Sequence, residues 1–333
     1  MKEQLVTKTL GLFGVGAVLM LAIAVAPAPV LAGDVNSQLF PGPDVNEISD
    51  NSAETLLNCT AGAACSVAGG VPGGSGGTTV DVGDKLVGIF SINTVENFTS
   101  GGPTHSLGLN SGNSELTGVF SIQVTGKVTN GTGGCTSAFC FTFGPSSSFA
   151  TDVQTVCGGG CTLPSGITGT PGGTMLAMFD DPTTPGDYSR TNPGGRGGNL
   201  GTAYNGSLYA YFGFAGAANE FWQATASSDD ISVIRNIAPP TPGGAFNMGL
   251  TRLAGGIMIP LDLVSCLFGS VNLCGSGGLI GVGDTDTDWH SFDNVDATIR
   301  PLIPEPSSVL LLGTGVAGLG LWRLRRNRSA KNA

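Results

Sequence analysis

Charge is scarce in this chain, and positive charge is the scarcest. Only 11% of its 333 residues are Asp, Glu, Lys or Arg. Between Gly33 and Ile303, seven basic residues stand against 22 acidic ones, which gives this part a net charge near −15. Phosphate groups and anionic lipid repel such a surface. We therefore expect no nucleic-acid partner; cations or a partner with basic groups fit better.

The familiar signatures of catalysis are also missing. The sequence has no Gly-x-Ser-x-Gly elbow, no His-Glu-x-x-His motif and no phosphate-binding loop ending in Gly-Lys-Ser. His105 and His290 are its two histidines, and no spacing places either beside a nucleophile. We expect the protein not to be an enzyme. A secreted hydrolase stays an alternative, because a glycosidase needs only two carboxylates.

The first 32 residues have the pattern of a secretory signal peptide. Lys2 and Lys8 precede an apolar run from Leu10 to Val25, and Val30-Leu31-Ala32 then offers small residues to signal peptidase. We expect the mature chain to begin near Gly33. A retained N-terminal anchor is the alternative.

The last thirty residues combine three features in a fixed order. Pro304-Glu305-Pro306 is followed by an uncharged run, Ser307 to Trp322, and then by a basic tail. As a helix, the run of sixteen residues spans roughly 24 Å, and the tail favours the cytoplasmic side. The tail consists of Arg323, Arg325, Arg326, Arg328 and Lys331. By themselves these features predict a short transmembrane helix that acts as a weak anchor with its tail inside; an ordinary tail anchor is the alternative to a more specific role.

The same order resembles the PEP-CTERM sorting signal of Gram-negative bacteria, also catalogued as the ice-binding protein C-terminal domain. The resemblance implies that exosortase, a membrane-embedded cysteine protease, cuts near Pro304, Glu305 and Pro306. It also implies a precursor anchored transiently in the inner membrane with a periplasmic body, which then passes to the cell surface or extracellular matrix. The resemblance covers about thirty residues and leaves the role of the body open.

Eight cysteines all lie in the expected exported part. They form four close couples, Cys59 with Cys65, Cys135 with Cys140, Cys157 with Cys161, and Cys266 with Cys274. An even number of cysteines in an oxidising compartment predicts disulfides, and local pairing is the simplest of 105 connectivities. Zinc ligation and a catalytic thiol are the alternatives; no couple has the two-residue spacing of a zinc knuckle.

Short apolar or alternating segments separated by Gly/Pro turns dominate residues 80–303. With no convincing amphipathic helix between them, they predict a mainly β fold, an antiparallel β-sandwich or jelly roll. The layout resembles lectin-like sandwiches found upstream of PEP-CTERM signals. The expected strands are Val80–Val95, Glu115–Val128, Phe139–Phe143, Phe149–Val156, Thr174–Phe179, Ser207–Phe214, Phe221–Ala226, Ile231–Ile237 and Phe292–Ile299.

These patterns divide the chain into four parts: a signal peptide (residues 1–32), an irregular Gly-rich segment (33–79), a β-rich exported body (80–303) and the sorting signal (304–333). Residues 33–79 are expected to be mostly irregular, with a short helix near Asn51 to Leu57 and a flexible Gly-rich link. Within the β-rich part, Lys85–Ile92 and Glu115–Ile122 share Leu, Gly, Phe, Ser and Ile at matching positions. With no third copy, we expect two equivalent strands of one sheet rather than a solenoid.

Two sets of side chains are candidates for binding. Asp284, Asp286 and Asp288 could bind Ca²⁺ through carboxylate oxygens, although Trp289 stands where an EF-hand loop needs glycine, so a solvated acidic turn is the alternative. Tyr209 and Tyr211 could form an exposed platform for polysaccharide, or could simply be core residues. No other cofactor is expected.

Together these patterns predict an exported, exosortase-sorted, non-catalytic protein associated with exopolysaccharide, biofilm or floc. A secreted carbohydrate-binding module, with or without calcium, is the alternative from a different class.

Overall fold

The computed structural model describes residues 35–40, 45–59, 64–97, 104–107, 114–158, 160–182, 186–191, 194–238, 241–282, 288–302 and 314. The chain divides into two compact units, residues 32–302, called the body below, and the terminal segments 1–31 and 303–333. The expected signal peptide lies outside the described residues, as does the expected transmembrane helix apart from Thr314. No helix within the described ranges combines the length and the apolar character needed to cross a membrane.

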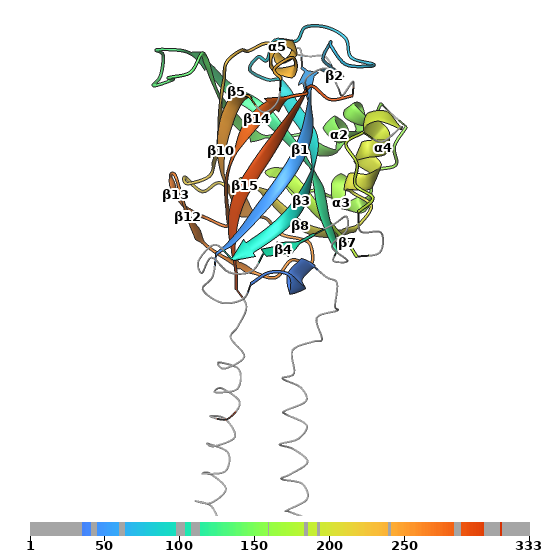
Figure 1. Cartoon of the computed structure of the whole chain (residues 1–333), viewed down its shortest axis with the longest axis vertical. Coiled ribbons are helices and arrows are strands. Elements are labelled where there is room, and N and C mark those ends of the chain that lie inside the picture. Colours follow the sequence, from blue (N-terminus) through green and yellow to red (C-terminus); the bar gives the residue numbers. More distant parts are fainter. Residues whose placement is uncertain are drawn as a thin grey trace, which may run out of the picture. The chain divides into compact units, whose positions relative to one another are not determined.

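Antiparallel strands make up most of the body, and thirteen of them hydrogen-bond into one sheet (Figure 1). Strands β12 (Val264–Cys266) and β13 (Gly269–Val271) form a separate hairpin. The strands of the large sheet are β1 (Asn46–Asn58), β2 (Ser66–Val67), β3 (Lys85–Asn97), β4 (Thr104–Ser106), β5 (Glu115–Thr129), β6 (Phe139–Pro145), β7 (Thr174–Asp181), β8 (Ser207–Gly213), β9 (Phe221–Ala226), β10 (Pro242–Arg252), β11 (Leu261–Asp262), β14 (Leu273–Gly281) and β15 (Ser291–Pro301).

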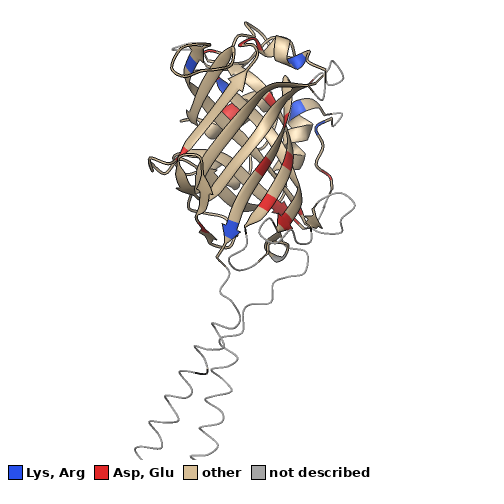
Figure 2. Ribbon diagram, turned by 60° about the vertical axis from the view of Figure 1, so that its left-hand side comes forward, with Lys and Arg blue, Asp and Glu red and all other residues tan. Residues whose placement is uncertain are grey.

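The large sheet closes on itself because the path β3-β1-β15-β14-β10 is linked back through shorter strands to β5, which pairs with β3. On one edge β5 pairs with β3, and on the other it pairs first with β7 and then with β6. Likewise β10 pairs with β14 on one edge and with β9 and β8 on the other. The pairs β6–β9 and β7–β8 complete the ring. Figure 2 shows the inclined strands wrapping round an interior.

The mainly β, antiparallel fold is confirmed, whereas the two-layer sandwich is not. Among the described strands, backbone hydrogen bonds link β1, β3, β5, β10, β14 and β15 with the split pairs into one continuous sheet. The interior is filled by apolar side chains from all sides of this ring, including Phe90, Phe120 and Phe246. The alternation of side chains along a strand indicates one buried face, and it does not say whether a second sheet or the same sheet covers that face.

The two similar sequence segments are neighbours in the sheet, as expected. They run antiparallel in β3 and β5, so that Gly88 pairs with Phe120 and Phe90 pairs with Gly118. A Cβ atom at either glycine would overlap the ring of the opposite phenylalanine. The repeated Gly-x-Phe pattern therefore lets each ring lie over the bare backbone of the other strand, which fixes the register.

A second core lies between the outer face of the sheet and three helices, α2 (Phe149–Cys157), α3 (Ser165–Thr168) and α4 (Gly195–Ala203). Figure 1 shows these helices together along one side of the sheet. Because both faces are covered there, all eight residues of β7 are buried. The remaining helices are the 3₁₀ turn η1 (Val35–Ser37) and α5 (Ile231–Arg235), which packs against β14 and β15.

Two of the expected strands are helices. The prediction for Phe149–Val156 was wrong because its buried residues Phe149, Val153 and Val156 follow helical spacing, and Gly158 ends α2 at φ 78°. The prediction for Ile231–Ile237 was also wrong. There Asp230 caps α5 by accepting a hydrogen bond from the backbone N–H of Ser232 at 2.9 Å.

The N-terminal part of the body is more regular than expected. Strand β1 occupies the segment Asn51 to Leu57 where a short helix was expected, and it pairs with both β3 and β15. Pairing on both edges overrides the weak strand propensity of its many polar residues. All four disulfides have the expected local connectivity: Cys59–Cys65, Cys135–Cys140, Cys157–Cys161 and Cys266–Cys274.

Candidate functional site

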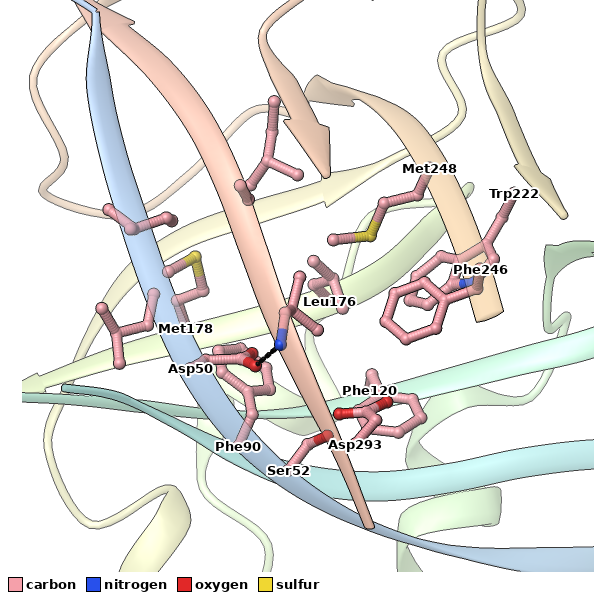
Figure 3. A pocket seen from close by; sticks show the side chains of 15 residues that line it. Asp50, Ser52, Phe90, Phe120, Leu176, Met178, Trp222, Phe246, Met248 and Asp293 are labelled. Atoms are coloured by element: carbon pink, nitrogen blue, oxygen red, sulfur yellow. Dashed lines mark hydrogen bonds between the residues drawn. The ribbon is translucent and has the colours of Figure 1, made fainter. Parts of the chain in front are cut away.

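A small cavity inside the closed sheet is the main candidate site. It has a volume of about 40 Å³, and its wall is mostly apolar, with aromatic side chains from β3, β5, β9 and β10 (Figure 3). Its lining residues are Ile48, Asp50, Ser52, Phe90, Ile92, Phe120, Leu176, Met178, Trp222, Phe246, Met248, Leu273, Asp293, Val295 and Ala297. A cavity of this size has room for a few water molecules.

Polar side chains gather on one part of this wall because β1 and β15 are neighbours in register. Ser52 lies opposite Asp293, and Glu54 lies opposite Ser291. Since alternate residues of a strand share a face, Asp50, Ser52 and Glu54 point to the same side. We call Asp50, Ser52, Glu54, Ser291 and Asp293 the carboxyl cluster. Figure 3 shows Asp50, Ser52 and Asp293 directed into the cavity.

Only part of the hydrogen-bonding capacity of the cluster is used. The hydroxyl of Ser291 donates to Glu54 Oε1 at 2.7 Å, and the backbone N–H of Val295 donates to Asp50 Oδ1 at 3.1 Å. A further side-chain hydrogen bond joins Glu54 and Asp293. Ser52 Oγ and Asp293 Oδ1 are buried and have no partner among the described residues. Unpaired buried polar atoms are costly, so these two mark a place where a partner would be favourable.

Burial determines the electrostatics of the cluster. It raises the pKa of Asp50 and of Asp293 well above their usual range, and it also raises the pKa of Glu54. The negative charges of Asp50 and Glu54 raise the pKa of Asp293 further, while Arg190 lowers it. The Arg190 guanidinium lies 4.2 Å from the centre of the Phe292 ring. With little compensating positive charge, the cluster favours protonated carboxyls when nothing else is bound.

Such a cluster can act in two ways. A protonated carboxyl donates a hydrogen bond to an acceptor, whereas an ionised one pairs with a cation brought into the cavity. Strongly shifted carboxyls inside a cavity are typical of functional sites, although structural clusters also occur. The arrangement therefore suits recognition of a small polar or cationic group within an apolar surround.

The C-terminal residues that follow the body contain a known protein-sorting motif. The family model of the PEP-CTERM protein-sorting motif matches residues 302–326, which include Pro304, Glu305 and Pro306. The chain carries a PEP-CTERM sorting signal. The match does not support the second catalogue name, the ice-binding protein C-terminal domain. No curated protein and no solved structure is significantly similar to the chain.

The tyrosines of this PEP-CTERM protein do not form an exposed platform. Tyr209 is 0% and Tyr211 4% exposed, and their hydroxyls donate to Asn36 Oδ1 at 3.0 Å and to the carbonyl of Gly166 at 2.8 Å. A register shift between β7 and β8 leaves Tyr209 as an extra residue. The two rings therefore enter different cores, and the prediction that they share an exposed face was wrong.

The proposed calcium ligands are not brought together within the described residues. Asp284 and Asp286 lie outside them, and Asp288 is described at the start of the segment that leads into β15. The backbone carbonyl of Asp288 accepts a hydrogen bond from Arg196 at 2.7 Å. Over the described ranges, no group of three His, Cys, Asp or Glu side chains is placed to hold a metal ion. The calcium site stays a prediction.

Neither histidine has the setting of a general base. His290 is fully buried; its Nδ1 accepts from the N–H of Leu56 at 3.3 Å and contacts Thr55 Oγ1 at 2.7 Å, and its Nε2 lies 2.8 Å from the carbonyl oxygen of Gly69. Burial lowers the pKa of His290 to about 4. His105 Nδ1 lies 2.8 Å from the carbonyl oxygen of Gln38, with the Phe40 ring beside it. Both rings are engaged in packing.

Sequence reasoning did not single out the carboxyl cluster. Its members come from two segments more than 230 residues apart, and both are rich in polar residues. A signal was present in the spacing: Asp50, Ser52 and Glu54 alternate, as do Ser291 and Asp293. That alternation becomes meaningful only when both segments are recognised as strands with a buried face.

Proposed function

We propose that this protein is a non-catalytic component of the cell surface or of the exopolysaccharide matrix. The PEP-CTERM signal at residues 302–326 is the observation that carries the proposal. It marks an exported protein that is anchored in the membrane and then processed by exosortase. The body would be released from the anchor and would remain in the surface layer.

The construction of the body supports a lasting extracellular role. Four local disulfides close loops of four to eight residues, and they lie in segments that are rich in glycine. Each such cross-link stabilises a short loop by about 2 kcal/mol. Closing the sheet also removes most free strand edges, which limits edge-to-edge aggregation at the high local concentration of a matrix.

The absence of catalysis is part of the proposal. The ring nitrogens of His290 already have hydrogen-bond partners, and Asp50 and Asp293 line a small, mostly apolar cavity. A glycosidase needs its carboxyls on both sides of a sugar ring in a cleft. Incubating the purified protein with glycan and peptide libraries tests this point, and reproducible turnover of any substrate would refute the non-catalytic assignment.

Deletion of the exosortase tests the sorting step. In the deletion strain we expect the full-length precursor, with its tail, in the membrane fraction, and none of the shorter species at the surface. A variant with Pro304→Ala and Pro306→Ala, expressed in the parent strain, should accumulate in the same way. A tail variant with Arg328→Lys keeps the charge and serves as the matched control. The appearance of the same mature species in the deletion strain would contradict exosortase processing.

Matrix association needs a separate measurement. We expect the processed protein to co-fractionate with exopolysaccharide and to leave that fraction when the polysaccharide is enzymatically degraded. Loss of the protein should reduce flocs or biofilm mass without affecting growth of single cells. Processed protein found entirely free in the medium, with unchanged flocs in its absence, would contradict the matrix role while leaving the sorting step intact.

A further inference from the structure

We propose that the body touches the membrane through the end at which β15 finishes, and that the partner of this surface is a neutral, zwitterionic lipid bilayer. Three half-exposed apolar side chains, Ile257, Leu263 and Leu302, form the surface, which we call the apolar rim. The contact belongs to the anchored precursor, so it rests on the sorting step of the proposed function, and it would end when the tail is removed.

One short segment brings the apolar rim together. The backbone N–H of Ile257 donates to the carbonyl of Leu208 near the start of β8 at 3.2 Å, and the N–H of Leu302 donates to the carbonyl of Pro260 at 2.7 Å. Directly after Pro260, β11 pairs with the end of β15. The segment 257–263 therefore runs along the end of the sheet from β8 to β15, where Leu302 completes the body.

The apolar rim is exposed, and the ion pair beside it carries no net charge. Ile257 is 53%, Leu263 51% and Leu302 53% exposed, and they are three of the eight large apolar side chains that are exposed in the described ranges. Arg300 Nη1 lies 3.9 Å from Asp262 Oδ2, so the two charges offset one another. The same Arg300 nitrogen donates to the carbonyl of Leu263 at 3.4 Å, which places the pair next to the rim.

The length of chain beyond the body indicates what the rim contacts. Only four residues, 303–306, separate Leu302 from the uncharged run that begins at Ser307. Even when fully extended, this stretch covers at most about 18 Å. While the tail holds the protein in the membrane, the end of β15 is therefore kept close to the lipid headgroups, where side chains that are partly apolar are favourably buried.

A neutral bilayer fits this surface better than an anionic one. Seven basic residues against 22 acidic ones make the body strongly acidic, and anionic lipid repels it. Three half-exposed side chains bury little area, so the contact depends on the tether, which gives the rim a high effective concentration at the membrane. Removal of the tail would therefore let the body leave. Until then, the contact would keep Pro304-Glu305-Pro306 beside the membrane, within reach of a membrane-embedded protease.

Quenching of tryptophan by brominated lipid tests the contact in the full chain. Leu263→Trp places a reporter on the apolar rim. Val233→Trp on α5 is the matched control, since Val233 is 50% exposed. Helix α5 lies against Gly281, which pairs with Ser291 at the start of β15, so the control and the rim occupy opposite ends of that strand (Figure 1).

Both reporters are combined with Trp322→Phe, because Trp322 lies in the uncharged run, whereas Trp222 and Trp289 are buried in the body. Each variant is reconstituted in phosphatidylcholine vesicles with or without bromine on the acyl chains, and flotation verifies its insertion. We expect brominated lipid to reduce the emission added by the rim reporter at least about twofold, because interfacial side chains reach the boundary of the acyl chains. The emission added by the control reporter should not change.

A double substitution separates the effect of the rim from that of the introduced tryptophan. Ile257→Ser with Leu302→Ser, made in the chain that carries the rim reporter, removes the other two apolar side chains and should reduce the quenching by at least about half. Circular dichroism verifies that each variant is folded.

The outcomes separate this proposal from the sorting step. Absence of quenching in a chain that floats with the vesicles, equal quenching of the control, or quenching that the double substitution leaves unchanged would overturn the contact with lipid. Since the vesicles contain no exosortase, the first of these results would leave a protein as the partner of the rim, with the sorting step intact. A full chain that does not float with the vesicles would overturn the anchored precursor together with the contact.

Discussion

Two buried polar clusters in this protein are built on neighbouring strands and differ in how completely they are satisfied. The carboxyl cluster lies inside the closed sheet, and two of its atoms, Ser52 Oγ and Asp293 Oδ1, have no partner among the described residues. The second cluster, called the lysine network, consists of Lys85, Ser121, Ser146, Ser148 and Asp152 and lies where α2 packs on the outer face of β3 and β5. Lys85 Nζ lies 2.7 Å from Asp152 Oδ1, with both side chains buried.

Each polar atom of the lysine network has a partner. Lys85 also donates to Ser148 Oγ at 2.5 Å, and the hydroxyls of Ser121 and Ser146 donate to Asp152 Oδ2. A buried ion pair with these hydrogen-bond partners holds α2 to the sheet. It leaves no unpaired donor or acceptor in the network for a ligand. The carboxyl cluster has neither the counter-charge nor the full set of bonds. The difference separates a cluster that holds the fold together from one that suits a bound partner.

The largest effect expected from this comparison is on the lysine network. Lys85→Met removes the cation and leaves Asp152 as a buried, uncompensated carboxylate. We expect the free energy of unfolding to fall by about 3–5 kcal/mol, the usual cost of breaking a buried ion pair. Urea denaturation followed by circular dichroism measures it. A loss below about 1 kcal/mol would mean that the network does not anchor α2.

The next largest expected effect is a change in stability at acidic pH that depends on His290. Its pKa is lowered to about 4 in the folded protein, compared with about 6.5 when unfolded. The stability that the neutral His290 ring contributes is therefore complete above pH 6.5 and is lost as the pH falls towards 4. We expect the difference in unfolding free energy between the parent and His290→Asn to shrink by on the order of 2–3 kcal/mol over that range. A difference that does not vary with pH would show that His290 is not held neutral.

Much of the fold was accessible from the sequence where the pattern is local. The alternation in Glu115–Val128, the likeness of Lys85–Ile92 to it and the close cysteine couples all predicted features that the structure has. These signals depend on residues a few positions apart. Helical spacing at Phe149, Val153 and Val156 was equally local, but the segment is short and apolar enough to be taken for a strand.

The rest depends on contacts between distant segments. Strand β1 contains many polar residues, and its conformation is determined by β3 and β15 on its two edges. Closure of the sheet depends on the pairing of β3 with β5 and on the short pairs that link β10 back to β5, which alternation alone does not encode. The carboxyl cluster exists only because Ser52 and Asp293 are paired across β1 and β15. No motif of fixed spacing could have revealed it.

A smaller effect, with the opposite pH dependence, is expected for Asp293→Asn. Because the pKa of Asp293 is raised in the folded protein, its contribution to stability is complete below about pH 4, the unfolded value, and is lost as the pH rises through the folded pKa. The amide mimics the protonated carboxyl, so stability near pH 5 should change by less than about 1 kcal/mol. The variant should then become increasingly more stable than the parent towards pH 9.

Thermal unfolding at several pH values measures that difference, and Asp296→Asn on the exposed face of β15 is the control. The control should give little growing difference because that carboxyl lies on the exposed face of β15, where it accepts a hydrogen bond from the Ser49 hydroxyl at 2.6 Å. A constant difference between the parent and Asp293→Asn across the pH range would contradict a protonated Asp293 in the empty cavity.

The smallest effect concerns a lysine that pairs with carboxylates at the surface. Lys127 lies 2.9 Å from Asp81 and 2.8 Å from Asp229, but 67% of the Asp81 side chain and 28% of the Asp229 side chain are exposed. Water screens such pairs, and holding the long side chain in place costs entropy, so Lys127→Met should reduce stability by only about 0.2–1 kcal/mol. Measured beside Lys85→Met, this variant separates the effect of burial from that of pairing, since both lysines contact carboxylates at under 3 Å. Equal losses for the two variants would show that burial and the surrounding serines add nothing to the lysine network, and the contrast between the two buried clusters would then lose its physical basis.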